Sequence, residues 1–154
     1  MSCDVAAISA FLWLAAAPAS PLGGAPALAP PSVAGEPLFA EIVQRAGKLK
    51  AETEAYEKGP LGAGLERLGG FSSFESEVSE LAALDMQGHT VLAERGAKDD
   101  LKCILKGISQ DLPVKLKALE AAGDAKARRE ALADMFYLLR DNVEVITSLP
   151  QPAA

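Results

Sequence analysis

The sequence predicts an all-α fold, an antiparallel four-helix bundle-like domain, and three observations support that prediction. Apolar residues recur at spacings of three and four along four segments between residues 36 and 149. Alternating β-branched runs are few, and no hairpin turn signal stands between them. Residues 36–149 also have the length of one ordinary domain, which can build a core without disulfides or metal.

The first helix is predicted from about Glu36 to Lys58. Gly59 and Pro60 follow it directly and end it. Its apolar positions alternate spacings of three and four, which is the seam of a heptad repeat. The predicted seam consists of Phe39, Ile42, Ala46, Leu49, Thr53 and Tyr56.

The second helix follows a Gly-rich loop over residues 61–70. We expect it to start near Ser72, with Glu75 three residues later as a capping box, and to end at Gly96. Gly88 lies inside it and weakens it by about 1 kcal/mol relative to Ala. Its predicted apolar arc consists of Phe74, Val78, Leu81, Leu84, Val91 and Leu92.

The third helix is predicted to begin around Lys98, with acidic residues in its first turn, and to end before Gly123. Pro113 lies inside the apolar pattern, so we expect it to kink or split this helix. One side is lined by Leu101, Ile104, Leu105, Ile108, Leu112, Leu116 and Leu119.

The fourth helix has the clearest periodicity, and Asp124 is its predicted N-cap. Additional apolar residues widen its stripe beyond a two-helix seam, so it should contact two neighbours. The seam is predicted to consist of Leu132, Phe136, Leu139, Val143 and Ile146, widened by Met135, Leu138 and Val145.

Residues 5–19 form an uncharged apolar run that resembles the core of an export signal. The run is shorter than the roughly 20 apolar residues that span a bilayer, and Ala17-Pro18-Ala19 offers small residues for cleavage before Ser20. We therefore expect a signal peptide at 1–19 and a periplasmic or secreted bacterial protein. Membrane attachment would come only through an uncleaved signal.

The mature protein is then expected to hold a Pro/Ala/Gly-rich linker at 20–35, the bundle at 36–149 and a disordered tail at 150–154. Losing Asp4 with the signal changes the formal charge from −6 to −5. A mildly acidic domain with few aromatic residues has neither the charge nor the stacking groups for nucleic acid, so that partner is not expected.

Asp85 and His89 are the first candidate site residues. They lie four apart on the second helix, so their side chains face each other near the apolar arc. A charged Asp85 at the core needs a partner such as His89, Arg or Lys. Met86 is three residues before His89, and together these residues suggest an alternative role in binding a metal or haem. The simpler interpretation is that His89 is a helix-end residue that caps carbonyls or lies at the bundle rim.

Cys103 is the second candidate. Cleavage of the signal would remove Cys3, the other of the two cysteines, and leave Cys103 without an internal partner. Lys102 and Lys106 flank it and would favour the thiolate, which suggests either a reactive thiol or a further metal ligand. The alternative is an inert thiol at a packed helix face.

Recognisable catalytic motifs are missing from the sequence, including a Gly-rich phosphate loop, a nucleophile elbow and a His-Glu-x-x-His zinc motif. The sequence therefore predicts a non-enzymatic, exported bundle without a cofactor that binds a protein partner or a small apolar ligand. A metal- or haem-binding module centred on His89, with Asp85, Met86 and Cys103, is the alternative.

Overall fold

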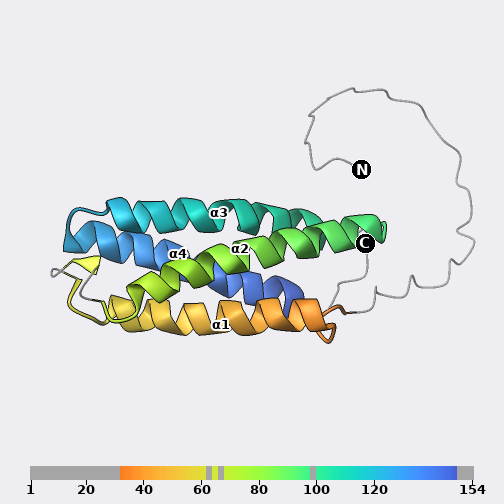
Figure 1. Ribbon diagram of the computed structural model, residues 1–154, viewed down its shortest axis with the longest axis horizontal. Helices are drawn as coiled ribbons and strands as arrows, with labels where there is room; N and C mark the ends of the chain where they lie inside the picture. The colour runs from red at the N-terminus through yellow and green to blue at the C-terminus, as the bar shows by residue number, and fades with distance from the viewer. Residues whose placement is uncertain (1–31, 62–63, 66–67, 98–99, 149–154) are drawn as a thin grey trace, which may run out of the picture. The chain divides into compact units, whose positions relative to one another are not determined.

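The computed structural model describes residues 32–61, 64–65, 68–97 and 100–148. These residues form four helices, α1 (Pro37–Glu57), α2 (Phe71–Glu94), α3 (Leu101–Ala121) and α4 (Ala125–Thr147). Each helix packs closely against the next, and α4 packs back against α1. The helices run alternately in opposite directions, so α1 lies diagonally from α3 and α2 from α4 (Figure 1). The predicted antiparallel four-helix bundle is confirmed.

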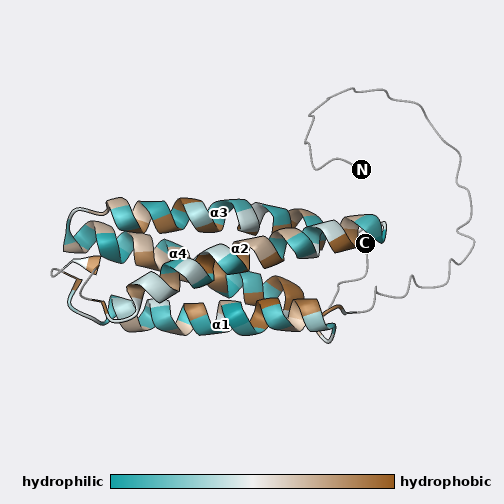
Figure 2. Cartoon of the chain, viewed as in Figure 1, coloured by the Kyte–Doolittle hydropathy of each residue, from teal (hydrophilic) through white to brown (hydrophobic). Residues whose placement is uncertain are grey.

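The core of the bundle follows heptad seams, and most polar residues lie outside them (Figure 2). All six predicted seam positions of α1 are buried, and they are its complete set of buried residues. In α2 the spacings of three and four continue without a break through two residues that are not large and apolar, Asp85 and Gly88. The α2 seam consists of Phe71, Phe74, Val78, Leu81, Asp85, Gly88 and Leu92.

The predicted seam of α4 is wrong at two positions. Met135 and Asn142 are buried where the sequence suggested Phe136 and Val143, which are half-buried. Where two adjacent residues could occupy a seam position, the prediction chose the more apolar one, and it therefore chose Val143 over Asn142. The observed seam keeps heptad spacing and consists of Leu132, Met135, Leu139, Asn142 and Ile146.

Two predicted helix ends are confirmed, and one is not. Asp124 caps α4 by accepting a hydrogen bond from the Ala127 N–H at 2.9 Å. Gly96 ends α2 with a φ of 68° and the paired hydrogen bonds of a Schellman motif. The predicted capping box of α2 does not form, because the N-cap is Gly70, with a φ of 81° and no side-chain cap, two residues before the predicted N-cap Ser72.

Pro113 does not split the third helix. The helix α3 continues through it from Leu101 to Ala121 (Figure 1). Proline removes one backbone hydrogen bond at a cost of about 3 kcal/mol. Burial of Leu112 and Leu116 on the core side offsets that cost, while Pro113 itself is exposed.

The predicted signal peptide at 1–19, Cys3, most of the linker and the tail at 150–154 lie outside the described residues. The last part of the predicted linker is described, and there Val33 and Ala34 pack against the core. Within the described part of the chain, none of the helices is long and apolar enough to cross a membrane.

Gly88 marks the point where two neighbouring helices both approach α2. A Cβ atom built there would lie 3.1 Å from Leu105 Cδ1 on α3, and 3.3 Å and 3.4 Å from Phe39 Cε1 and Ile42 Cδ1 on α1. All three neighbours are buried, so they have little room to move. The glycine that weakens α2 locally therefore permits its close packing.

We expect Gly88→Ala to lower the free energy of unfolding by about 1 kcal/mol, because overpacking outweighs the gain of about 1 kcal/mol in helix propensity. Gly107→Ala in α3 is the matched control, since its Cβ would meet nothing within 4 Å. That change should stabilise the bundle by about 0.5–1 kcal/mol. Urea denaturation measures both, and equal stabilisation by the two changes would contradict the packing role of Gly88.

Candidate functional site

A buried polar pair crosses the centre of the bundle. Asp85 on α2 and Asn142 on α4 are both 0% exposed, and Asn142 Nδ2 donates a hydrogen bond of 2.8 Å to Asp85 Oδ2. Because α2 and α4 are diagonal neighbours, this bond spans the core between helices that otherwise contact each other little. The partner of Asp85 is thus an amide, and not the His89, Arg or Lys that the sequence suggested.

Burial determines the protonation state of the Asp85 carboxyl group. Desolvation raises the pKa of Asp85 from 3.8 to about 7, and the hydrogen bond from Asn142 lowers it by less. Among the described side chains, Asp85 Oδ1 and Asn142 Oδ1 are buried without a hydrogen-bond partner. A protonated Asp85 gains an O–H donor, which is the group that the unpartnered amide oxygen needs. The neutral acid therefore suits this position better than the carboxylate.

His89 faces α3 rather than Asp85. Its Nδ1 lies 2.6 Å from the backbone carbonyl oxygen of Lys102. A carbonyl only accepts hydrogen bonds, so Nδ1 donates its proton to it, and of the two ring nitrogens only Nε2 can offer a lone pair. The contact is with a carbonyl, as the simpler interpretation predicted, but the carbonyl belongs to the neighbouring helix.

The structure gives the four predicted metal-binding residues separate surroundings. Asp85 is committed to Asn142 in the core, Met86 is exposed, and His89 bonds to α3. Cys103 is half-buried and is not a free thiol. Over the described residues, no group of three or more His, Cys, Asp or Glu side chains lies close enough together to hold a metal ion.

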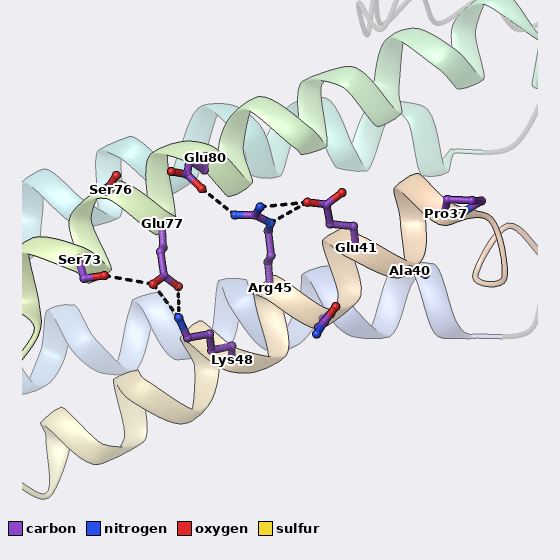
Figure 3. A pocket seen from close by; sticks show the side chains of 10 residues that line it. Pro37, Ala40, Glu41, Arg45, Lys48, Ser73, Ser76, Glu77 and Glu80 are labelled. Carbon is purple, nitrogen blue, oxygen red and sulfur yellow. Dashed lines mark hydrogen bonds and ion pairs between the residues drawn. The ribbon is translucent and has the colours of Figure 1, made fainter.

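A polar groove separates α1 from α2 (Figure 3). Two ion pairs bridge it, Arg45 to Glu80 at 2.7 Å and Lys48 to Glu77 at 2.6 Å. Its volume is about 930 Å³, and it is open to solvent. We call it the α1–α2 groove, and it is lined by Pro37, Ala40, Glu41, Gln44, Arg45, Lys48, Ser73, Ser76, Glu77 and Glu80.

A second, more apolar concavity lies at the end of the bundle where α2 begins and α3 ends. Its volume is about 550 Å³, and Leu68 and Phe71 in its wall are buried core residues. Sequence analysis missed both concavities, because each combines residues from different helices whose register follows from packing. We call this one the end hollow, and it is lined by Leu65, Leu68, Gly69, Gly70, Phe71, Ser72, Glu75 and Glu120.

Aromatic packing and loop hydrogen bonds support the end hollow. Phe71 and Phe74 stack at 6.0 Å between ring centroids, and the Tyr56 ring meets both edge-on. Tyr56 Oη donates to the Gly69 carbonyl at 3.2 Å, and Arg128 on α4 donates to the Leu61 carbonyl. The described part of the loop between α1 and α2 is thus anchored to two helices.

No family model, curated protein or solved structure matches this chain. The choice between these features therefore depends on their chemistry. The buried pair is closed to ligands. The α1–α2 groove and the end hollow are equally open to solvent, but the groove is strongly polar, whereas the hollow combines apolar walls with a few polar groups. The last of these has the composition of a small-molecule site.

Asp85 predicts an unusual pH dependence of stability. Its pKa is higher in the folded chain than the 3.8 of the free side chain, so between about pH 4 and pH 7 the folded chain holds one more proton than the unfolded chain. The contribution of Asp85 to the unfolding free energy therefore falls as the pH rises through this window. A shift of about three pH units corresponds to a loss of up to about 4 kcal/mol.

The variant Asp85→Asn isolates this effect, because an amide can both donate to Asn142 Oδ1 and accept from Nδ2 as the protonated acid does. We expect it to match the wild type in unfolding free energy near pH 4 and to exceed it at pH 8. Urea denaturation across this range measures the difference, with exposed Asp111→Asn as the charge-matched control. Parallel pH profiles for wild type and Asp85→Asn would contradict a raised pKa at Asp85.

Proposed function

We propose that this chain is an exported, non-enzymatic binding protein of the periplasm or the extracellular space, and that it binds a small apolar ligand in the end hollow. The observation that carries the proposal is the hollow itself, an apolar concavity of about 550 Å³ beside an anchored loop. Sites for small ligands commonly have volumes of roughly 300–1,000 Å³, mainly apolar walls and a few polar groups. The apolar run at residues 5–19 supports export.

The rest of the described core is filled by side chains. Twelve large side chains, among them Phe39, Phe74 and Met135, are less than 2% exposed and belong to one continuous cluster. A ligand that entered between the helices would have to displace them, at a cost comparable to overpacking. Binding at the end of the bundle needs no such rearrangement.

A protein partner at the α1–α2 groove is the second candidate. Its bridging ion pairs join side chains that are a quarter to a half exposed, and pairs of this kind contribute about 0–1 kcal/mol each. A partner could replace them with its own charges at little cost. Photo-crosslinking from Ser76, with Asp111 as the control position outside the groove, tests this; adducts of equal yield from both positions would count against it.

The metal- or haem-binding alternative centred on His89 needs further ligands. The Nε2 lone pair is suitable, because a histidine that donates Nδ1–H to a carbonyl is common at metal centres. Asp85, however, is held by Asn142 and would have to leave the core to take part. We therefore rank this alternative below binding at the end hollow.

The neutral apolar dye Nile red tests the proposed function. We expect the full-length chain to enhance its fluorescence at a stoichiometry of one, because the hollow removes the dye from water. Gly69→Trp should abolish the enhancement, since Gly69 is exposed in the wall, a Cβ atom there meets no neighbour within 4 Å, and an indole ring attached to it would fill the hollow. Gly35→Trp, exposed and outside the hollow, is the matched control.

Equal fluorescence with both tryptophan variants would place the dye elsewhere and contradict the proposal. Circular dichroism and urea denaturation of the two variants check that the bundle is intact. Ligand binding to the folded state should also raise the midpoint of thermal unfolding of the wild type but not of Gly69→Trp.

A further inference from the structure

The rim of the end hollow is acidic. Glu75 reaches it from α2 and Glu120 from α3, so the two carboxylates come from different helices. Glu75 is half-buried and Glu120 is exposed. Of the described residues that line the hollow, none is basic. The described side chains on its rim thus carry a formal charge of −2 beside an apolar wall.

The helix dipoles at the hollow do not cancel the negative charge of its rim. The first residues of α2, including Phe71 and Ser72, bring the positive end of one dipole to the hollow, equivalent to roughly +0.5 charge. Glu120 is the next-to-last residue of α3, so the negative end of a second dipole, roughly −0.5, lies on the other side. The two helices meet here with opposite ends (Figure 1). Their contributions offset each other, so Glu75 and Glu120 are the full charges among the described residues that line the hollow.

The walls of the hollow indicate which uncharged group a ligand would carry. Leu65 is half-buried, and the edges of the buried Leu68 and Phe71 complete an apolar wall, which favours a hydrocarbon chain or ring. An anionic amphiphile, such as a fatty acid, would place its head group against two like charges, which is unfavourable in a partly desolvated site.

From this arrangement we propose that the end hollow binds an amphiphilic cation, a molecule that joins an apolar chain or ring to an amine or quaternary ammonium group. The apolar part occupies the wall formed by Leu65, Leu68 and Phe71, and the cation lies between Glu75 and Glu120. This inference rests on the proposed function, because it assigns the class of ligand for the same hollow.

Three detergents with the same octyl chain, used below their critical micelle concentrations, test it by isothermal titration calorimetry on the full-length chain. Octyltrimethylammonium is the cationic probe, octyl glucoside the neutral one and octyl sulfate the anionic one. We expect one cationic molecule to bind per chain, about tenfold more tightly than the neutral probe, with the anionic probe weakest. Gly69→Trp should abolish this binding.

The double variant Glu75→Gln/Glu120→Gln removes the charge and keeps the shape of the hollow. It should bind the cationic and neutral probes with equal affinity. The control Glu94→Gln/Asp111→Asn removes the same number of charges from exposed positions outside the hollow and should bind as the wild type does. An equal loss of affinity in both double variants would show a net-charge effect and overturn the inference.

Two further outcomes separate this inference from the proposed function. If wild type binds the neutral probe as tightly as the cation, the hollow takes neutral apolar ligands, so the cation inference fails and the proposed function stands. If none of the three probes binds and Nile red fluorescence is also unchanged, both fail together.

Discussion

The hydrogen bond between Asp85 and Asn142 is the interaction on which the alignment of this bundle depends. Leucine seams can slide along one another by a heptad with little change in chemistry, because each step brings similar side chains together. A buried carboxyl group cannot slide in this way, since leaving its amide partner costs roughly 1–3 kcal/mol or more. Asp85 and Asn142 lie on diagonal helices, so one bond sets α2 against α4 across the whole core.

Because Asp85 can ionise, burying this pair costs more free energy than burying a pair of neutral polar side chains. Burial raises the pKa of Asp85 to about 7, so near neutral pH the carboxyl group is poised between the acid and the carboxylate. Buried polar pairs generally lower stability relative to apolar residues of the same size, and their best-attested use is to specify register. The surrounding seam offsets that cost, because the neighbouring core positions Leu81 and Leu139 are fully buried.

Much of the fold could be predicted from the sequence, because apolar periodicity carries most of the information about helices. Every buried position of α1 was predicted, and so were the Asp124 cap and the Gly96 terminus. Some errors concern apolar positions, such as Ile104 of α3, which is exposed. Two others lie where the seam is polar. Asn142 was passed over for Val143, and Asp85 was expected to need a charged partner.

These two errors have one physical origin. Within its own helix, each of the two polar residues interrupts an apolar seam without an evident reason. Their positions are explained only when they are considered together, as hydrogen-bond partners. The heptad spacing could have predicted that both residues are buried, because Asp85 and Asn142 both occupy seam positions of their own helices. The end hollow and the α1–α2 groove carried no such signal, since each is formed by side chains whose proximity depends on how the helices pack.

The buried pair also determines the geometry of the end hollow, although the two are far apart. Phe71 and Asp85 lie on the same helix, 14 residues apart in the sequence, or about 21 Å along its axis. A slip of α2 by one heptad would carry Phe71 about 10 Å along the bundle, away from Glu120 at the end of α3. The apolar wall and the acidic rim would then separate. The polar pair in the core therefore holds together the two halves of a site to which it contributes no atom.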